Sequence, residues 1–173
     1  GGINNLESSP TLTNTTITNN TATSGGGIDN NNSSPTITNT TITNNTANLG
    51  GGIYNVSSSP IFINTTISNN SADQNGGGII NFSSSPTITN TTISNNSANN
   101  EGGGIYNASS SPTINNSIIW GNTKFSNQSV NNILNINNSI PVYKYSLIQG
   151  SVVNSNWVSS FGANGGNNID INP

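Results

Sequence analysis

The chain has 173 residues, of which only 4% are charged, and its five acids and two basic residues give a net charge of −3. So few cations cannot neutralise phosphates, which argues against nucleic acid as a partner. The lack of Cys excludes a disulfide framework and thiolate metal sites, and no apolar run approaches the roughly 20 residues that span a bilayer.

A phrase of the form Gly-Gly-Ile-x-Asn, followed by Ser-Pro, recurs five times along the chain. The Ile residues of this phrase are Ile3, Ile28, Ile53, Ile79 and Ile105. The distance from each Ile to the next Pro and to the repeated Ala is constant, and only the segment between Ala and the glycines changes length, by one residue. A fixed period indicates stacked supersecondary units, and we expect the variable segment to be an exposed corner.

Within each repeat, Ile alternates with Thr, as in residues 35–38 and 41–43. This alternation places Ile in the interior and Thr in solvent. Each repeat offers three short strands, namely Gly-Ile-x-Asn and two Thr-Ile-Thr segments. Strands stacked about 4.8 Å apart predict an all-β, right-handed parallel β-helix with 25–26 residues per coil. Its expected inward columns are the repeated Ile column, Leu12/Ile37/Phe62/Ile88/Ile114 and Ile17/Ile42/Ile67/Ile93/Ile119.

Asn occupies three further positions in every repeat. The three columns are Asn5/Asn30/Asn55/Asn81/Asn107, Asn14/Asn39/Asn64/Asn90/Asn116 and Asn20/Asn45/Asn70/Asn96/Asn122. Asn tolerates left-handed backbone at corners, and its amide can bond the same amide in the next coil. We therefore assign these columns a structural role. Asn55, Asn81 and Asn107 are also glycosylation acceptors by motif, but an inward side chain has no room for a glycan, which favours a prokaryotic source.

The regular repeat ends after Trp120, and Lys124 stands where the repeated Ala is expected. We expect residues 1–123 to form about five regular coils and residues 124–173 to form irregular coils that continue the same solenoid. A separate domain of some 50 residues with so little apolar content would bury a poor core. Because the chain begins in mid-repeat, we expect it to be part of a longer protein.

Several phrases resemble a known repeat family. Gly-Gly-Gly-Ile-Tyr-Asn at 102–107, Ser-Pro-Thr-Ile at 111–114 and Asn-Asn-Ser-Ala at 95–98 are similar to the repeats of bacterial right-handed β-helix surface proteins, notably the polymorphic outer membrane proteins. Residues 117–122, 145–150 and 166–173 resemble the closing coils of such proteins. The resemblance implies secretion, an extracellular or cell-surface location in bacteria and often adhesion, and it brings no catalytic residues.

Enzymatic chemistry has little support in the residues. Acid–base catalysis needs paired carboxylates or a tuned base, whereas Asp29 is expected on a strand and Asp73 and Glu101 in the variable corner. No acid cluster supplies enough oxygen ligands for calcium. We therefore expect no enzyme, cofactor or metal site. A carbohydrate-active β-helix enzyme is the last alternative, and it would require acids that converge.

Two surfaces are candidates for binding. The first is a grid of outward hydroxyls: Thr16, Thr18, Thr36, Thr38, Thr41, Thr43, Thr66, Ser68, Thr87, Thr89, Thr92 and Ser94. It resembles the ice-binding faces of β-solenoid antifreeze proteins, although Thr is also simply a good outward strand residue. The grid is interrupted at Ile61 and Ile63 and ends at Ile118 and Trp120.

The second surface is a strip formed by Tyr54, Ile80 and Tyr106, which are expected to face outward from the first strand of their coils. The residues at positions 56, 82 and 108 either join this strip or turn inward. An exposed strip of this kind suits a protein or carbohydrate partner.

The sequence thus favours a non-enzymatic, secreted or cell-surface β-helix that acts as a structural stalk or adhesin. Ice binding by the Thr grid is the alternative. The partner is unknown, and the classes considered are a surface glycan, a protein of a host or neighbouring cell, and ice. Open coil ends also predict end-to-end self-association.

Overall fold

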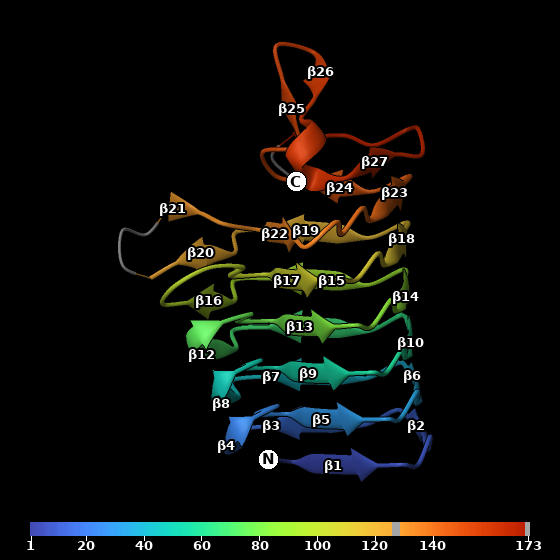
Figure 1. Cartoon of the computed structure of the whole chain (residues 1–173), viewed down its shortest axis with the longest axis vertical. Coiled ribbons are helices and arrows are strands. Elements are labelled where there is room, and N and C mark those ends of the chain that lie inside the picture. The colour runs from blue at the N-terminus through green and yellow to red at the C-terminus, as the bar shows by residue number, and fades with distance from the viewer. Residues whose placement is uncertain (126–128, 172–173) are drawn as a thin grey trace.

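The computed structural model describes residues 1–125 and 129–171, and in this part of the chain strands stack in coils along one axis (Figure 1). The strands form four sheets that run the length of the solenoid, named A to D here. Residues 126–128 and 172–173, which belong to the predicted irregular tail, lie outside the described residues.

Each sheet takes one strand from each regular coil. Sheet A contains β1 (Ile3–Leu6), β5 (Ile28–Asn31), β9 (Ile53–Val56), β13 (Ile79–Phe82), β17 (Ile105–Ala108) and β22 (Ile133–Ile136). Sheet B contains β2 (Thr11–Thr13), β6 (Thr36–Thr38), β10 (Ile61–Ile63), β14 (Thr87–Thr89), β18 (Thr113–Asn115), β23 (Val142–Lys144) and β27 (Ala163–Asn164). Sheet C contains β3 (Thr16–Thr18), β7 (Thr41–Thr43), β11 (Thr66–Ser68), β15 (Thr92–Ser94), β19 (Ile118–Trp120) and β24 (Leu147–Ile148). Sheet D contains β4 (Thr21–Ser24), β8 (Thr46–Leu49), β12 (Ser71–Asn75), β16 (Ser97–Ala98), β20 (Thr123–Lys124) and β21 (Ser129–Val130).

The pairing confirms a parallel β-helix. Neighbouring strands in each sheet are parallel, except for the antiparallel pair β20–β21, and Ile28 pairs in register with Ile3 below and Ile53 above. The coils rise in a right-handed sense: β5 runs left to right on the near side of Figure 1, and the chain returns along the far side. The three predicted strands of each coil are present.

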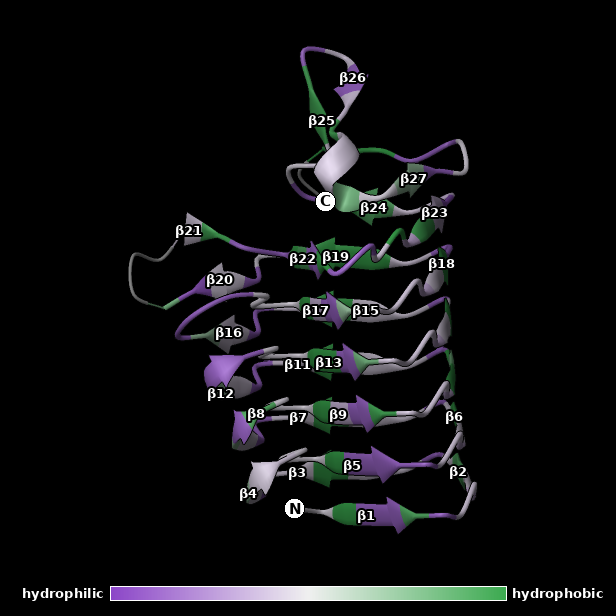
Figure 2. Cartoon of the chain, viewed as in Figure 1, coloured by the Kyte–Doolittle hydropathy of each residue, from purple (hydrophilic) through white to green (hydrophobic). Residues whose placement is uncertain are grey.

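Sheet D is a fourth, short strand column that the sequence analysis treated as a corner. It forms because the alternation of small inward and polar outward residues continues there, with Ala47, Ala72 and Ala98 buried in one column. The extra residue of the longer repeats shifts the register of β12 between Ala72 and Asn75. Asp73 and Gln74 at this bulge are exposed, and β12 is hydrophilic in Figure 2. The insertion therefore falls at an exposed edge, as predicted.

The core consists of the predicted inward columns. From Ile28 and Ile37 upward, their side chains are completely buried, while Ile3 and Leu12 in the first coil are partly buried. The corners between strands are short because they use left-handed backbone. Asn39 and Asn44, for example, have φ values of 50° and 56°, which Asn tolerates better than most residues.

Two of the three Asn columns form buried ladders. In the first, each amide nitrogen from Asn5 to Asn107 donates to the amide oxygen one coil above at 2.8–2.9 Å. In the second, which starts at Asn20, the corresponding distances are 2.9–3.0 Å. The remaining column, Asn14 to Asn116, occupies exposed corners with φ of 47–53°. The three motif acceptors Asn55, Asn81 and Asn107 point inward and have no exposed area.

A buried serine column escaped the sequence analysis. Ser33, Ser58 and Ser84 lie just after sheet A, and the hydroxyl oxygen of each serine from Ser58 upward accepts a hydrogen bond from the backbone N–H of its counterpart one coil below, at 2.9 Å. These bonds satisfy backbone groups at the corner where no sheet hydrogen bond is available. The signal was the invariant Ser two residues before each Pro from Ser33 onward.

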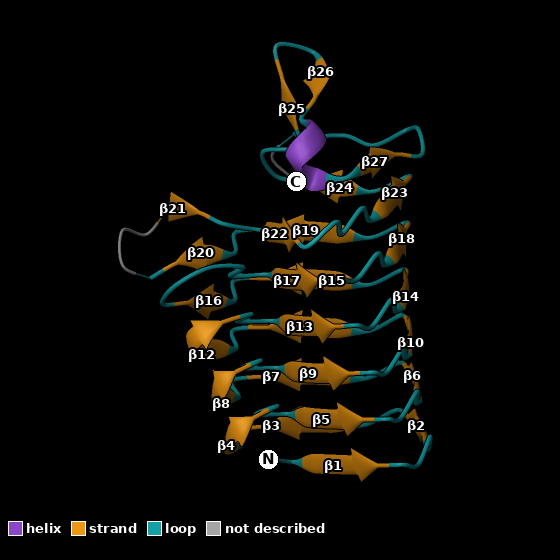
Figure 3. Cartoon of the chain, viewed as in Figure 1, coloured by secondary structure: helices purple, strands orange, loops and turns teal. Residues whose placement is uncertain are grey.

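The C-terminal segment closes the top of the solenoid. Strands β22, β23 and β24 extend sheets A, B and C, and above them lie a hairpin of β25 (Val152–Val153) and β26 (Asn156–Trp157) and the 3-10 helix η1 (Ser159–Phe161), which Figure 3 shows in purple. Trp157 packs between the rings of Tyr143 and Phe161. The amide of Asn135, at the end of the first ladder, donates to the carbonyls of Ser160 and Phe161.

Candidate binding surfaces

The outer side of sheet A carries two columns of outward residues. They are Asn4, Asp29, Tyr54, Ile80, Tyr106 and Leu134 in one column, and Leu6, Asn31, Val56, Phe82, Ala108 and Ile136 in the other. From β9 to β22 every one of these residues is apolar or aromatic, and we call this part the apolar face. It contrasts with the Thr-rich outer sides of sheets B and C.

Three rings interlock on the apolar face. Phe82 packs edge to face against Tyr54, with ring centroids 5.7 Å apart, and against Tyr106, at 5.9 Å. All three rings are partly exposed. We call these three residues the aromatic strip. Phe82 thus belongs to the outward set, which the sequence analysis left open.

Ile80 was expected to be an exposed member of this strip, and that expectation is wrong. It points outward from β13 but has no exposed area. Its neighbours in the column are Tyr54 and Tyr106, whose rings both pack on Phe82. Gly76 also lies so close that a Cβ there would clash with Ile80 Cγ1. The flanking rings and the glycine corner therefore bury Ile80, which supports the strip from beneath.

Asp29 is the only charged residue in the two outer columns of sheet A, and it pairs in register with Tyr54. Burial raises the pKa of the Asp29 carboxyl above its ordinary value, and the N-terminal amine opposes this with a smaller effect. Burial also raises the pKa of Tyr54, and the nearby charge of Asp29 adds to the rise. The Tyr54 hydroxyl therefore stays protonated at neutral pH.

Exposed serines border the apolar face on one side. Ser57, Ser83 and Ser109 follow the outer column directly, and all three are exposed with φ of 48–52°. Their hydroxyls repeat at the coil spacing of about 4.8 Å. The face thus has an apolar floor and a hydroxyl-bearing edge.

The predicted hydroxyl grid lies on the outer sides of sheets B and C. In sheet C, Thr16, Thr41, Thr66 and Thr92 pair in register over four coils, as do Thr18, Thr43, Ser68 and Ser94. Of the twelve grid positions Thr16 and Thr87 are exposed, and the others are partly exposed. In sheet B, Ile61 separates Thr36 from Thr87 and is 41% exposed. The structure therefore places these residues on two neighbouring sides, and only the sheet C columns are continuous.

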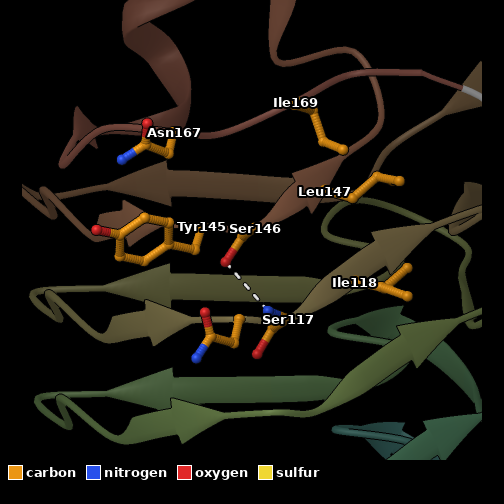
Figure 4. A pocket seen from close by; sticks show the side chains of 8 residues that line it. Ser117, Ile118, Tyr145, Ser146, Leu147, Asn167 and Ile169 are labelled. Atoms are coloured by element: carbon orange, nitrogen blue, oxygen red, sulfur yellow. Dashed lines mark hydrogen bonds between the residues drawn. The ribbon is translucent and has the colours of Figure 1, made fainter.

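A hollow of about 390 Å³ lies where the sheet C grid ends (Figure 4). Ile118, Tyr145, Leu147 and Ile169 give it an apolar lining, and Asn116 and Asn167 also line it. The sequence analysis did not single it out. In the sequence, the hollow is indicated by Ile118, which replaces Thr in the outward column. Residues 167–169 contribute to the hollow only because the tail folds back along β24.

The charged groups are scattered in the described part of the chain. The Lys124 amine contacts a Glu101 carboxylate oxygen at 2.7 Å, and Asn131 donates to the other oxygen. The carboxylate of Asp170 accepts from the backbone N–H groups of Gly150 and Val152. Within residues 1–125 and 129–171, no three His, Cys, Asp or Glu residues gather as a potential metal site. Among the same residues, no helix is long and apolar enough to cross a bilayer.

Residues 39–56 and 90–108 match the family model of the Chlamydia polymorphic membrane protein repeat. These two segments are similar to that repeat, and the parallel β-solenoid agrees with the likeness. Both matched segments run from an Asn corner through sheets C and D and the glycine triplet to the end of a sheet A strand. Searches among curated proteins and solved structures found no significant match. The similarity indicates a bacterial surface β-helix protein.

Proposed function

We propose that these repeats form a non-enzymatic stalk at a bacterial surface, and that the stalk attaches to a partner as an adhesin does. The observation that carries this proposal is the apolar face. It lies on one side of a rod whose other sheets present mainly Thr, Ser and Asn, with Ile61 and Ile118 as exposed exceptions, and its aromatic rings stay partly exposed. Surface aromatic residues grouped in this way are typical of interaction sites.

The architecture supports a stalk. Each coil adds about 4.8 Å to the length of the rod, and the two buried amide ladders satisfy polar groups without any charge. Stability therefore depends little on salt or on moderate changes of pH, which suits a protein outside the cell. End-to-end association through the N-terminal edge strands stays a prediction.

Attachment can be tested with beads that carry the purified chain, mixed with cells of a panel of bacterial and eukaryotic types under gentle flow. We expect retention on at least one cell type, and we expect the double variant Tyr54→Ser/Tyr106→Ser to lower it at least tenfold. The variant Thr38→Ser, on the outer side of sheet B, is the matched surface control. Equal retention of the wild type and of beads without protein would contradict the adhesin role.

The second candidate is ice binding by the sheet C grid, and its support is the pair of hydroxyl columns that continue in register over four coils. Thermal hysteresis of the wild type, lost in the variant Thr41→Tyr, would establish this activity. A wild type without hysteresis or ice-crystal shaping removes it. The adhesin proposal predicts that second result.

A further inference from the structure

The spacing of the two tyrosines defines a repeat along the solenoid. Tyr54 and Tyr106 occupy the same column two coils apart, with Ile80 between them. Two coil rises of roughly 4.8 Å place them about 9.6 Å apart. This is close to the length of one disaccharide in an extended β-1,4-linked glycan, where every second sugar ring presents the same face. Both tyrosines would therefore meet equivalent sugar faces.

Phe82 fixes the orientation of the two tyrosine rings. It comes from the intervening coil and lies in the neighbouring column, and its ring contacts both tyrosine rings. In a two-fold β-1,4 chain the intervening sugar is turned over relative to its neighbours. The Phe82 ring stands at 73° and 70° to the two tyrosine rings, so it holds them in place and does not itself offer a face for stacking.

The chemistry of the face suits an uncharged polysaccharide. Sugar rings have apolar C–H faces and hydroxyl edges, and the apolar face has an aromatic floor with Ser57, Ser83 and Ser109 along one side. No charged residue stands in its outer columns between β9 and β22. A charged polymer would gain nothing there to offset the loss of its hydration.

The size of the face also favours a glycan over a protein. Four coils at about 4.8 Å and two outward columns about 7 Å apart give a surface of roughly 130 Å². A stable protein interface buries about 800 Å² on each partner. The face accommodates a chain of four sugars and little more.

We propose that the apolar face binds an uncharged β-1,4-linked glycan that runs parallel to the solenoid axis, with alternate sugars stacked on Tyr54 and Tyr106 and the sugar between them at the edge of the Phe82 ring. This inference rests on the proposed function and names its ligand. The glycan would be a glucan or an N-acetylglucosamine polymer, and the face presents the features that the two have in common.

Isothermal titration calorimetry with cello-oligosaccharides and chito-oligosaccharides of two to six sugars tests the proposal. We expect at least one series to bind, with affinity that rises up to four sugars and then levels off. Tyr54→Ala and Tyr106→Ala should each weaken binding at least tenfold, whereas Tyr54→Phe keeps the ring and should weaken it less than threefold. Tyr145, which is 53% exposed near the sheet C hollow, supplies the matched control Tyr145→Ala, expected to leave affinity unchanged.

Circular dichroism of each variant separates lost binding from lost folding. No binding of either series by the folded wild type would overturn the inference, and so would binding by Tyr54→Ala and Tyr106→Ala that is as tight as that of the wild type. The bead assay separates a failure of the glycan proposal from a failure of the adhesin proposal. Cell attachment without glycan binding refutes the ligand and leaves the adhesin role, whereas glycan binding without attachment to any cell type supports the ligand and refutes that role.

Discussion

Replacing Asn55 with alanine tests how much the first buried ladder stabilises the coils. The Asn55 amide accepts from Asn30 Nδ2 at 2.8 Å and donates to Asn81 Oδ1 at 2.9 Å, and all three side chains are completely buried. Truncation leaves one donor and one acceptor buried without partners. Each such group costs about 1–3 kcal/mol, so Asn55→Ala should lower the free energy of unfolding by about 2–6 kcal/mol.

Asn64 provides the matched control, because its amide makes the same two kinds of bond at the surface. It donates to Asn39 and accepts from Asn90, both at 3.2 Å, in an exposed corner with φ of 52°. Asn64→Gly keeps the left-handed backbone accessible, and water replaces the lost partners. We expect this variant to lose less than about 1 kcal/mol.

Guanidinium unfolding followed by circular dichroism measures both variants. Since repeat arrays unfold in parts, hydrogen exchange of the β9 and β13 amides should be recorded as well, and Asn55→Ala should accelerate it most in those coils. If Asn55→Ala is no less stable than Asn64→Gly, burial of the amides does not determine how much the ladder stabilises the fold, and the reasoning fails.

Three further changes test other features of the coils. Because burial raises the pKa of the Asp29 carboxyl, the ionised form costs stability above that pKa. Asp29→Asn should therefore raise the free energy of unfolding at pH 7 by less than about 1 kcal/mol, since the group is half-exposed. The gain should vanish in thermal unfolding at pH 3, where the carboxyl is protonated in both states. Gly77→Ala would bring a Cβ to 2.3 Å from the Ser97 carbonyl oxygen. We therefore expect a denaturant titration to show a loss of about 3 kcal/mol or more in the free energy of unfolding. A variant as stable as the wild type would show that the coils are not in close contact there. Glu101→Gln breaks a partly exposed ion pair with Lys124 and should change the unfolding free energy by less than about 1 kcal/mol, with a larger loss indicating a more buried pair.

The aromatic strip illustrates where sequence reasoning stopped. Alternation along β13 correctly placed Ile80 on the outer side of sheet A, but it could not tell that two rings from the coils above and below, and a third from the next column, would cover it. The sequence also left open whether Phe82 faces outward, and its contacts with the two tyrosine rings place it in the strip. Exposure depends on side chains more than 20 residues away in sequence, and no local pattern contains them.

The repeat itself determined the architecture. Identical residues at a fixed period can satisfy their buried amides and fill their core only by stacking on their own counterparts, so the columns of Ile and Asn required parallel coils in register. Only the tertiary structure decided which outward residues remain exposed, how the longer repeats bulge at β12, and how the irregular tail closes the top against Tyr143. These features depend on packing between non-equivalent residues, for which periodicity carries no information.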